Sequence, residues 1–202
     1  MPEKLFNYTI IKVLGEGGMS RVYLAEEALT KQKVAIKELL PNLAHSNDLR
    51  QRFRQEAQIM AKLDHPNIVK LLRYEETPTS FYLIMEYVDG MDLERLINDV
   101  TGPIAETKAI EIMSVLLDAF GYAHQQGVVH RDIKPANIII NTQGKVKILD
   151  FGIAKIVDQD ATGKTKTGIR IGTVAYMSPE QVNTMRDIDL RTDIYSLGVM
   201  LH

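Results

Sequence analysis

The residue pattern changes along the chain from stretches typical of strands to stretches typical of helices, and this order limits the fold more than any other feature. Five segments before residue 89 are rich in β-branched and aromatic residues and are separated by turn residues. Their sequences are YTIIKVLG, SRVYLAEE, QKVAIKEL, IVKLLRYEE and SFYLIMEYV. Between the third and fourth, residues 46–63 carry apolar side chains at three- and four-residue spacing, which indicates one amphipathic helix. Strands gathered in one part of the chain predict an α+β fold with an antiparallel five-stranded sheet.

The segments after Asp89-Gly90 are mostly helical. Residues 106–124 form the longest predicted helix, and Gly127 is suited to end it. The apolar face of this helix is predicted to contain Ile110, Met113, Leu117, Phe120 and His124. Short strands are expected over 128–130, 137–140 and 145–151, and a final helix over 194–202. We therefore expect a first domain over 1–85, a link over 86–89 and a helical second domain over 90–202.

The charge and the cysteine content exclude several classes of function. The 202 residues contain 24 Lys+Arg and 26 Asp+Glu, and the net charge of -2 gives no overall attraction to nucleic acid or to an acidic membrane. The absence of cysteine excludes disulfides, a thiol nucleophile and zinc–thiolate sites, and fits a reducing compartment. No apolar run reaches about 18 residues, the length that a membrane helix needs. We expect a cytoplasmic chain that contacts neither nucleic acid nor membrane.

Two motifs in the first domain point to phosphate binding. The stretch GEGGMSRV at 15–22 joins two predicted strands, so its glycines let backbone N–H groups approach a polyphosphate. The alternative is a glycine-rich turn without a ligand. A Rossmann site is not expected, because a strand and not a helix follows the glycines, and a Walker A loop would need Lys-Ser/Thr after its last glycine. Lys37 ends the apolar strand VAIK, and Glu56 lies in the predicted helix. Because a cation in a partly apolar cleft needs an anionic partner, we expect an ion pair that holds Lys37 toward α- and β-phosphates.

The stretch HRDIKPAN at 130–137 is the most specific chemical signal in the sequence. Asp132 can accept a hydrogen bond from a substrate hydroxyl, Lys134 can neutralise charge on a transferring phosphoryl group, and Asn137 can offer its side-chain oxygen to Mg²⁺. Asp150, in the tripeptide DFG, follows the apolar strand VKIL 13 residues after Asn137. We expect Asn137 and Asp150 to bind a metal ion in one cleft.

These motifs, in this order, resemble the Hanks-type (eukaryotic-like) bacterial serine/threonine protein kinases. The resemblance covers the whole chain and includes GEGGMSRV, VAIK, the helix glutamate, EYV, HRDIKPAN, DFG, Ser178-Pro179-Glu180 and RTDIYSLG. It implies a bilobal kinase fold with a five-stranded small lobe, a hinge at 86–89 and an activation segment over 150–180. It also implies further helices after residue 202, so we expect the large lobe to be incomplete and the chain to be truncated within it.

The resemblance implies ATP as substrate with Mg²⁺, or alternatively Mn²⁺, as the metal. The implied catalytic residues are Asp132, Lys134, Asn137, Lys37 and Glu56. The implied metal ligands are Asn137 and Asp150. The implied nucleotide-binding residues are Leu14, Gly15, Glu16, Gly17, Gly18, Met19, Ser20, Arg21, Val22, Ala35, Lys37, Met85, Glu86, Val88, Asp92 and Ile139. A packed stack of Leu71, Met60, Phe151 and His130 is implied as well.

Regulation is expected in the activation segment. Thr165 and Thr167 match the spacing of autophosphorylated threonines in bacterial relatives, and Arg131 beside Asp132 can pair with a phosphothreonine. Thr173 is expected to line the acceptor site instead. The implied partners are protein substrates and a second kinase chain for autophosphorylation.

Three other interpretations remain open at this point. A pseudokinase scaffold would bind nucleotide or partners without turnover, although it has no chemical need for Lys37, Asp132, Asn137 and Asp150 together. A small-molecule kinase of related fold could share the aspartates, but the SPE segment favours a protein acceptor. An inactive kinase fragment would follow from missing helices.

Overall fold

The computed structural model describes residues 3–41, 43, 45–77, 79–151, 174–183 and 188–202. The chain divides into two compact units. The first unit contains Met1–Ala61 and Val69–Tyr87, and the second contains Lys62–Ile68 and Val88–His202. Each unit is described by itself below.

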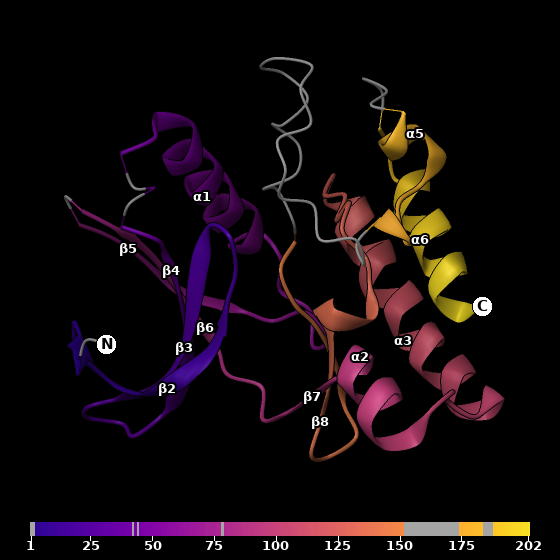
Figure 1. Cartoon of the computed structure of the whole chain (residues 1–202), viewed down its shortest axis with the longest axis horizontal. Helices are drawn as coiled ribbons and strands as arrows, with labels where there is room; N and C mark the ends of the chain where they lie inside the picture. Colours follow the sequence, from indigo (N-terminus) through magenta and orange to yellow (C-terminus); the bar gives the residue numbers. More distant parts are fainter. Residues whose placement is uncertain (1–2, 42, 44, 78, 152–173, 184–187) are drawn as a thin grey trace. The chain divides into compact units, whose positions relative to one another are not determined.

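The first unit is built on an antiparallel sheet with the strand order β1-β2-β3-β4-β6-β5 (Figure 1). The strands are β1 (Lys4–Leu5), β2 (Tyr8–Glu16), β3 (Ser20–Glu27), β4 (Lys33–Leu39), β5 (Leu71–Glu76) and β6 (Phe81–Glu86). The sheet therefore has one strand more than the five predicted. Strand β1 pairs with the start of β2 through a turn in which Phe6 has a φ of 55°. Two residues are too few to show an alternating pattern, so this strand could not be predicted from the sequence.

Helix α1 (Asn47–Met60) contacts β5 and β6, and it begins where the sequence predicted. The Ser46 hydroxyl accepts a hydrogen bond from the Leu49 N–H and caps the first turn. The side chains of Phe53, Ala57 and Met60 are buried on one face of the helix.

Apolar side chains on one face of the sheet form the core of the first unit. They are Tyr8, Ile10, Tyr23, Ala25, Val34, Ile36, Tyr82 and Ile84, two from each of four strands at alternating positions. Strand β6 is buried along nearly its whole length, because its alternate residues also face α1. A strand covered on both faces explains the continuous apolar run FYLIM.

The second unit combines a small sheet with helices (Figure 1). Its strands pair in the order β7 (Gly90–Asp92), β8 (Ile138–Asn141) and β9 (Val146–Ile148). The helices are α2 (Leu93–Arg95), the π-helical turn η1 (Leu96–Thr101), α3 (Glu106–Gln125), the 3₁₀ turn η2 (Pro135–Asn137), α5 (Pro179–Val182) and α6 (Arg191–Leu201). Helix α3 contacts α6. No helix within the described residues is long and apolar enough to cross a membrane.

Residues 62–68 belong to the second unit, although the sequence placed them in a first domain over 1–85. The reason is a set of hydrogen bonds to β9. The Asn67 side chain donates to the Val146 carbonyl at 2.8 Å, and the Asn67 carbonyl accepts from the Ile148 N–H at 2.7 Å. Ile68 also forms a parallel bridge with Ile148. Backbone pairing between residues so far apart in the chain cannot be predicted from local sequence patterns.

Two local predictions for the second unit are wrong. Residues 128–130 form no strand, because the His130 N–H bonds to a side chain of α6 instead of a neighbouring strand. On α3, Ile110 and Leu117 are more than half exposed, and among the predicted face only Phe120 is buried. The buried residues of this helix are Ile112, Leu116, Ala119, Phe120 and Ala123. Apolar residues occur nearly all round α3, so periodicity alone could not choose the buried face.

Candidate active site

Lys37 and Glu56 meet inside the first unit. The Lys37 Nζ lies 2.6 Å from the Glu56 Oε1, and only 12% and 6% of the two side chains are exposed. Lys37 faces Val22 across β3 and β4, and Ala35 faces Met85 across β4 and β6. The strand register thus gathers four residues that the sequence assigned to nucleotide binding and catalysis.

The glycine-rich stretch is the hairpin between β2 and β3. The Gly17 N–H donates to the Ser20 carbonyl at 2.8 Å and closes the turn, which also contains Gly18 and Met19. Leu14, Gly15 and Glu16 lie at the end of β2, while Ser20, Arg21 and Val22 begin β3. A hairpin is the structure that distinguishes this stretch from a Rossmann turn, where a helix would follow.

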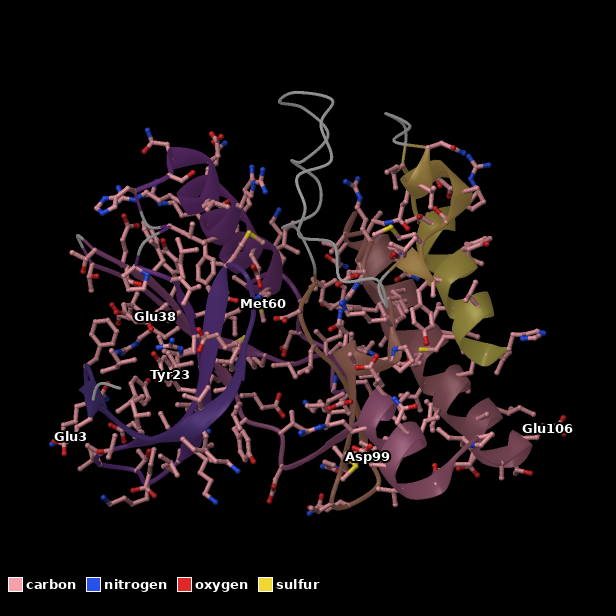
Figure 2. All side chains as sticks on the ribbon, in the orientation of Figure 1. Glu3, Tyr23, Glu38, Met60, Asp99 and Glu106 are labelled. Atoms are coloured by element: carbon pink, nitrogen blue, oxygen red, sulfur yellow. The ribbon has the colours of Figure 1, made fainter. Side chains whose placement is uncertain are left out.

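Glu16 and Arg21 pair with each other across this hairpin. The Arg21 Nε and Nη2 donate to the two carboxylate oxygens of Glu16 at 2.8 and 3.0 Å. The bonds lower the pKa of Glu16 and raise that of Arg21, since each charge is stabilised by the other. Beyond the pair, the Tyr23 hydroxyl donates to the buried Glu38 at 2.8 Å, and burial raises the pKa of Tyr23 (Figure 2). The side chains of Glu16 and Arg21 therefore brace the hairpin.

The end of β6 carries the residues assigned to the adenine. Met85 is buried, and Glu86 donates its N–H to the Lys70 carbonyl at 2.9 Å. Because the Glu86 N–H is engaged in this bond, the Glu86 carbonyl is the backbone group of this residue that could accept a hydrogen bond from an adenine base. In the second unit, Asp92 faces Ile139 across β7 and β8, and the Asp92 carboxylate caps α2 by accepting from the Arg95 N–H at 2.9 Å. Val88 lies in the connection before β7.

Asp132, Lys134 and Asn137 form one cluster. The Lys134 Nζ lies 2.9 Å from the Asp132 Oδ2. The Asn137 side-chain amide donates to the Asp132 carbonyl at 2.8 Å and to Oδ2 at 3.3 Å. The 3₁₀ turn η2, started by the buried Pro135, brings Asn137 back toward Asp132. A carboxylate contacted by a cation and an amide is held in a fixed position, from which it can accept a hydrogen bond from a hydroxyl.

Asp193 of α6 anchors this loop, a role that the sequence did not assign. Its side chain is fully buried, and its two oxygens accept from the N–H groups of His130 and Arg131 at 2.8 Å each. The His124 Nε2 lies 2.8 Å from the same carboxylate. Arg131 has a φ of 64°, a conformation that costs energy outside glycine, and the bonds to Asp193 offset that cost. The sequence signal that could have indicated this role is an aspartate within an otherwise apolar helix, because a buried carboxylate needs hydrogen-bond partners.

His130 is held in one tautomer. Its Nδ1 lies 3.2 Å from the Asp132 N–H and must therefore accept, while its Nε2 lies 3.1 Å from the Leu149 carbonyl and must donate. The ring is fully buried and contacts Phe151, with 4.8 Å between ring centroids. His130 and Phe151 thus pack together as the sequence indicated, and the remainder of the expected stack with Leu71 and Met60 stays a prediction.

Asn137 and Asp150 are neighbours through the backbone. The Leu149 N–H donates to the Asn137 carbonyl at 2.8 Å, which places the residue after Leu149 beside the stretch 130–137. Because the Asn137 amide nitrogen bonds to Asp132, its side-chain oxygen is the atom suited to a metal. Among the described residues, no group of three or more His, Asp or Glu side chains could hold an ion. One carboxylate and one amide oxygen fit Mg²⁺, which keeps several waters and usually takes substrate phosphates as further ligands.

Residues 178–181 bond to the loop that carries Asp132 and to α6. The Ser178 hydroxyl caps α5 and lies within hydrogen-bond distance of the Thr192 hydroxyl, and Ser178 is fully buried. The Gln181 side chain donates to the Arg131 carbonyl at 2.8 Å. Thr165, Thr167 and Thr173 lie outside the described residues. The sequence did not anticipate this capping box or its link to Arg131.

Comparisons with known proteins agree with the motifs and the fold. The protein kinase domain family matches residues 8–202. The chain is 43% identical to the serine/threonine-protein kinase PrkC of Bacillus subtilis and 42% identical to PknB of Mycolicibacterium smegmatis, over 96% of its own length in both. It spans only 29% and 32% of those two proteins.

A solved structure gives the same result. The crystal structure of the Mycobacterium tuberculosis PknI kinase domain has a TM-score of 0.72 at 28% identity, and the match covers 96% of this chain and 72% of that chain. The fold, the family match and the order of the motifs agree. The chain belongs to the protein kinase domain family and is similar to its bacterial serine/threonine members.

Proposed function

We propose that this chain transfers the γ-phosphoryl group of ATP to serine or threonine hydroxyls of protein substrates. The observation that carries the proposal is the Asp132 cluster, in which one carboxylate is held by Lys134 and Asn137. The relatives with the same motifs are named serine/threonine-protein kinases. The proposed site of action is the cytoplasm, which suits a chain without cysteine.

In the proposed reaction, Asp132 accepts the hydrogen bond of the attacking hydroxyl and takes its proton as the new O–P bond forms. The bond between the γ-phosphorus and the β-phosphate oxygen breaks, and ADP leaves. Lys134 neutralises charge on the transferring group, and Lys37, held by Glu56, binds the α- and β-phosphates. Asn137 and Asp150 would hold Mg²⁺, which screens the negative charge of the phosphates.

Further roles in nucleotide binding are proposed for residues of each unit taken by itself. Backbone N–H groups of the hairpin at 15–22 would bind phosphate oxygens, and the apolar side chains of Val22, Ala35 and Ile139 would pack on the adenine. The Glu86 carbonyl and the Val88 backbone would bond to its edge. Asp92, which already caps α2, would accept a hydrogen bond from the ribose.

The variant Asp132→Asn tests this proposal. It should abolish phosphoryl transfer and leave ATP binding nearly unchanged, because the amide keeps the shape of the side chain but takes no proton. Asp99→Asn is a suitable control, since Asp99 is exposed on η1 (Figure 2). Transfer from radiolabelled ATP is measured with a protein and with an aminoglycoside as acceptor, and ATP binding by calorimetry.

The possible results distinguish the proposed function from its alternatives. Transfer that survives in Asp132→Asn contradicts the role of Asp132. Labelling of the aminoglycoside alone indicates a small-molecule kinase. Binding without transfer by the unaltered chain indicates a pseudokinase scaffold or an inactive fragment.

We also propose that phosphorylation of Thr165 and Thr167 regulates the activity through Arg131. The Arg131 guanidinium donates to the Ile188 carbonyl at 3.2 Å, while its Nε is buried and has no hydrogen-bond partner among the described residues. A phosphate group would supply an acceptor. Mass spectrometry after incubation with ATP should find phosphate on both threonines, at a rate that rises with protein concentration if two chains phosphorylate each other. Phosphate confined to Thr162 would contradict this assignment.

A further inference from the structure

The position of helix α1 decides whether Glu56 reaches Lys37. The helix has a buried apolar face formed by Phe53, Ala57 and Met60, and polar or charged side chains occupy most of its other positions. Apolar contact resists removal of the helix from the sheet, but it opposes rolling of the helix about its own axis only weakly, because it is non-directional. Directional bonds on the two flanks of the helix are what would fix its rotation.

One such bond is the Lys37–Glu56 ion pair, and a second lies on the opposite flank. The Arg54 Nη2 and Nε donate to the two carboxylate oxygens of Glu76 at 2.6 and 3.2 Å. Glu76 lies 22 residues away from Arg54, at the end of β5. Residues two apart on an α-helix project about 200° from each other, so Arg54 and Glu56 point to opposite sides. The helix is therefore held to β4 on one flank and to β5 on the other.

Aromatic side chains support the second flank. The guanidinium carbons of Arg50 and Arg54 lie 5.1 and 5.6 Å from the ring centre of Phe81, which is fully buried in β6. The Tyr74 hydroxyl donates to the Glu76 carboxylate at 3.0 Å. Two cations one turn apart on a helix repel each other, and the carboxylate of Glu76 relieves that repulsion. The bond from Arg54 lowers the pKa of Glu76, and the charge of Arg50 adds to the effect.

We propose that Arg54 and Glu76 form a clamp that sets the rotation of α1 and so keeps Glu56 in contact with Lys37. Arg54 and Glu76 are positioning residues, since they act through the ion pair and touch no substrate. The proposal rests on the function proposed above only for its effect on phosphoryl transfer. The effect on α1 and on Lys37 stands independently of activity.

The chain offers a matched control on the same strand. Arg73 and Glu75 form an ion pair at 3.4 Å, and both lie on β5, so this pair does not reach α1. Arg73→Ala therefore removes an ion pair from the same edge of the sheet without releasing the helix. The test compares Arg54→Ala and Glu76→Ala with Arg73→Ala, and adds the charge-exchanged double variant Arg54→Glu/Glu76→Arg.

Two measurements need no enzymatic activity. Hydrogen exchange of the backbone amides over 50–60 should be about threefold to fivefold faster in Arg54→Ala and Glu76→Ala than in Arg73→Ala. Acylation of the Lys37 amine by an N-hydroxysuccinimide ester, followed by peptide mass spectrometry, should speed up by a similar factor, because the amine spends time away from Glu56. The charge-exchanged variant should return both rates to within about twofold of the unaltered chain.

The kinetic measurement separates positioning from general damage. With the unaltered chain active, kcat should fall about fivefold in Arg54→Ala with little change in the KM for the protein substrate, while Arg73→Ala keeps both values. Equal exchange and acylation rates in Arg54→Ala, Glu76→Ala and Arg73→Ala would overturn the clamp. So would a charge-exchanged variant no better than the single variants. A chain that transfers no phosphate at all contradicts the proposed function, and the exchange and acylation rates still decide the clamp.

Discussion

Lys37 and Asp132 are held in place by different kinds of interaction. Lys37 forms an ion pair with Glu56, which lies on a helix fixed to its sheet by apolar contact and by long charged side chains. Asp132 lies in a loop whose preceding backbone N–H groups bond to the fully buried Asp193. The first arrangement joins two side chains across two elements, and the second joins a side chain to the backbone itself.

This difference indicates which part can change its geometry at low cost. The partly exposed Arg54–Glu76 pair, with 50% and 35% of its side chains exposed, contributes about 0–1 kcal/mol, so the rotation of α1 is easily altered. A buried carboxylate that loses its partners costs several kcal/mol, so the loop of Asp132 has no comparable freedom. A small change in side-chain bonds should therefore move α1 more readily than the loop of Asp132.

Asp193→Asn tests the rigid side of this comparison and should have the largest effect. The amide keeps one acceptor oxygen but turns an N–H₂ toward a backbone N–H, so one of the two loop bonds is lost inside the protein. We expect the second unit to lose about 3–5 kcal/mol of unfolding free energy. Chemical denaturation measures this loss. Asp189→Asn is the control, because Asp189 pairs with Arg191 in an exposed position, and equal losses in the two variants would contradict the anchoring role.

Gly90→Ala tests whether the small sheet beside the loop is equally intolerant. A Cβ at this position would lie 2.3 Å from the Ile140 carbonyl oxygen and 2.6 Å from the Asn141 Cα, both of them backbone atoms. We expect a loss of about 1–3 kcal/mol, since β7 and β8 must separate. At Gly121, on α3, an added Cβ meets no atom within 4 Å, so Gly121→Ala should keep or raise stability by up to about 1 kcal/mol. Thermal melting measures both effects. A neutral Gly90→Ala would contradict the register in which β7 pairs with β8.

Glu56→Gln tests the adjustable side. Glutamine keeps the size of the side chain but removes the charge that holds Lys37. Transfer should slow about tenfold, equivalent to about 1.4 kcal/mol, because Lys37 loses its charged partner. Glutamine can still accept a hydrogen bond from Lys37, so the unfolding free energy should fall by about 1–3 kcal/mol, less than in Asp193→Asn. Steady-state kinetics and chemical denaturation measure the two quantities. A loss of unfolding free energy as large as that of Asp193→Asn would contradict the contrast between the two units.

Acid should weaken the clamp of α1, and this is the smallest of the four expected effects. The pKa of Glu76 lies below its ordinary value of 4.5, chiefly because Arg54 donates to it. A lowered pKa means that the stabilisation is complete above about pH 4.5 and disappears as the pH falls through the lowered value. The difference in melting temperature between the unaltered chain and Glu76→Gln should be present at neutral pH and vanish in acid. A difference that persisted or grew in acid would contradict the sign of this shift.

Much of the fold followed from local sequence patterns, and the exceptions have identifiable causes. The five longer strands of the first sheet and the helices α1, α3 and α6 arise from alternation and helical spacing that a single segment carries by itself. The two-residue β1 is too short for such a pattern. The buried face of α3 was predicted wrongly, because Ile110 and Leu117 are as apolar as the residues that are buried.

The residues assigned to phosphate, metal and hydroxyl chemistry were identified by type and spacing, because that chemistry needs few kinds of side chain, whereas the residues assigned to adenine and ribose came from the family resemblance. Their local partners within a motif, such as Lys134 beside Asp132, also follow from spacing. The partners that are distant in sequence do not. Nothing near Arg54 indicates Glu76, and nothing near His130 indicates Asp193.

The sequence by itself determined the fold class, the family and the kinds of residue that could perform phosphoryl transfer. Only the tertiary structure decided that Asp193 anchors the loop of Asp132, that residues 62–68 join the second unit, and that Arg54 meets Glu76. The physical reason is the range of the interactions. Periodicity and turn preferences act between residues a few positions apart, whereas a buried carboxylate or an ion pair finds its partner wherever folding brings a donor within about 3 Å.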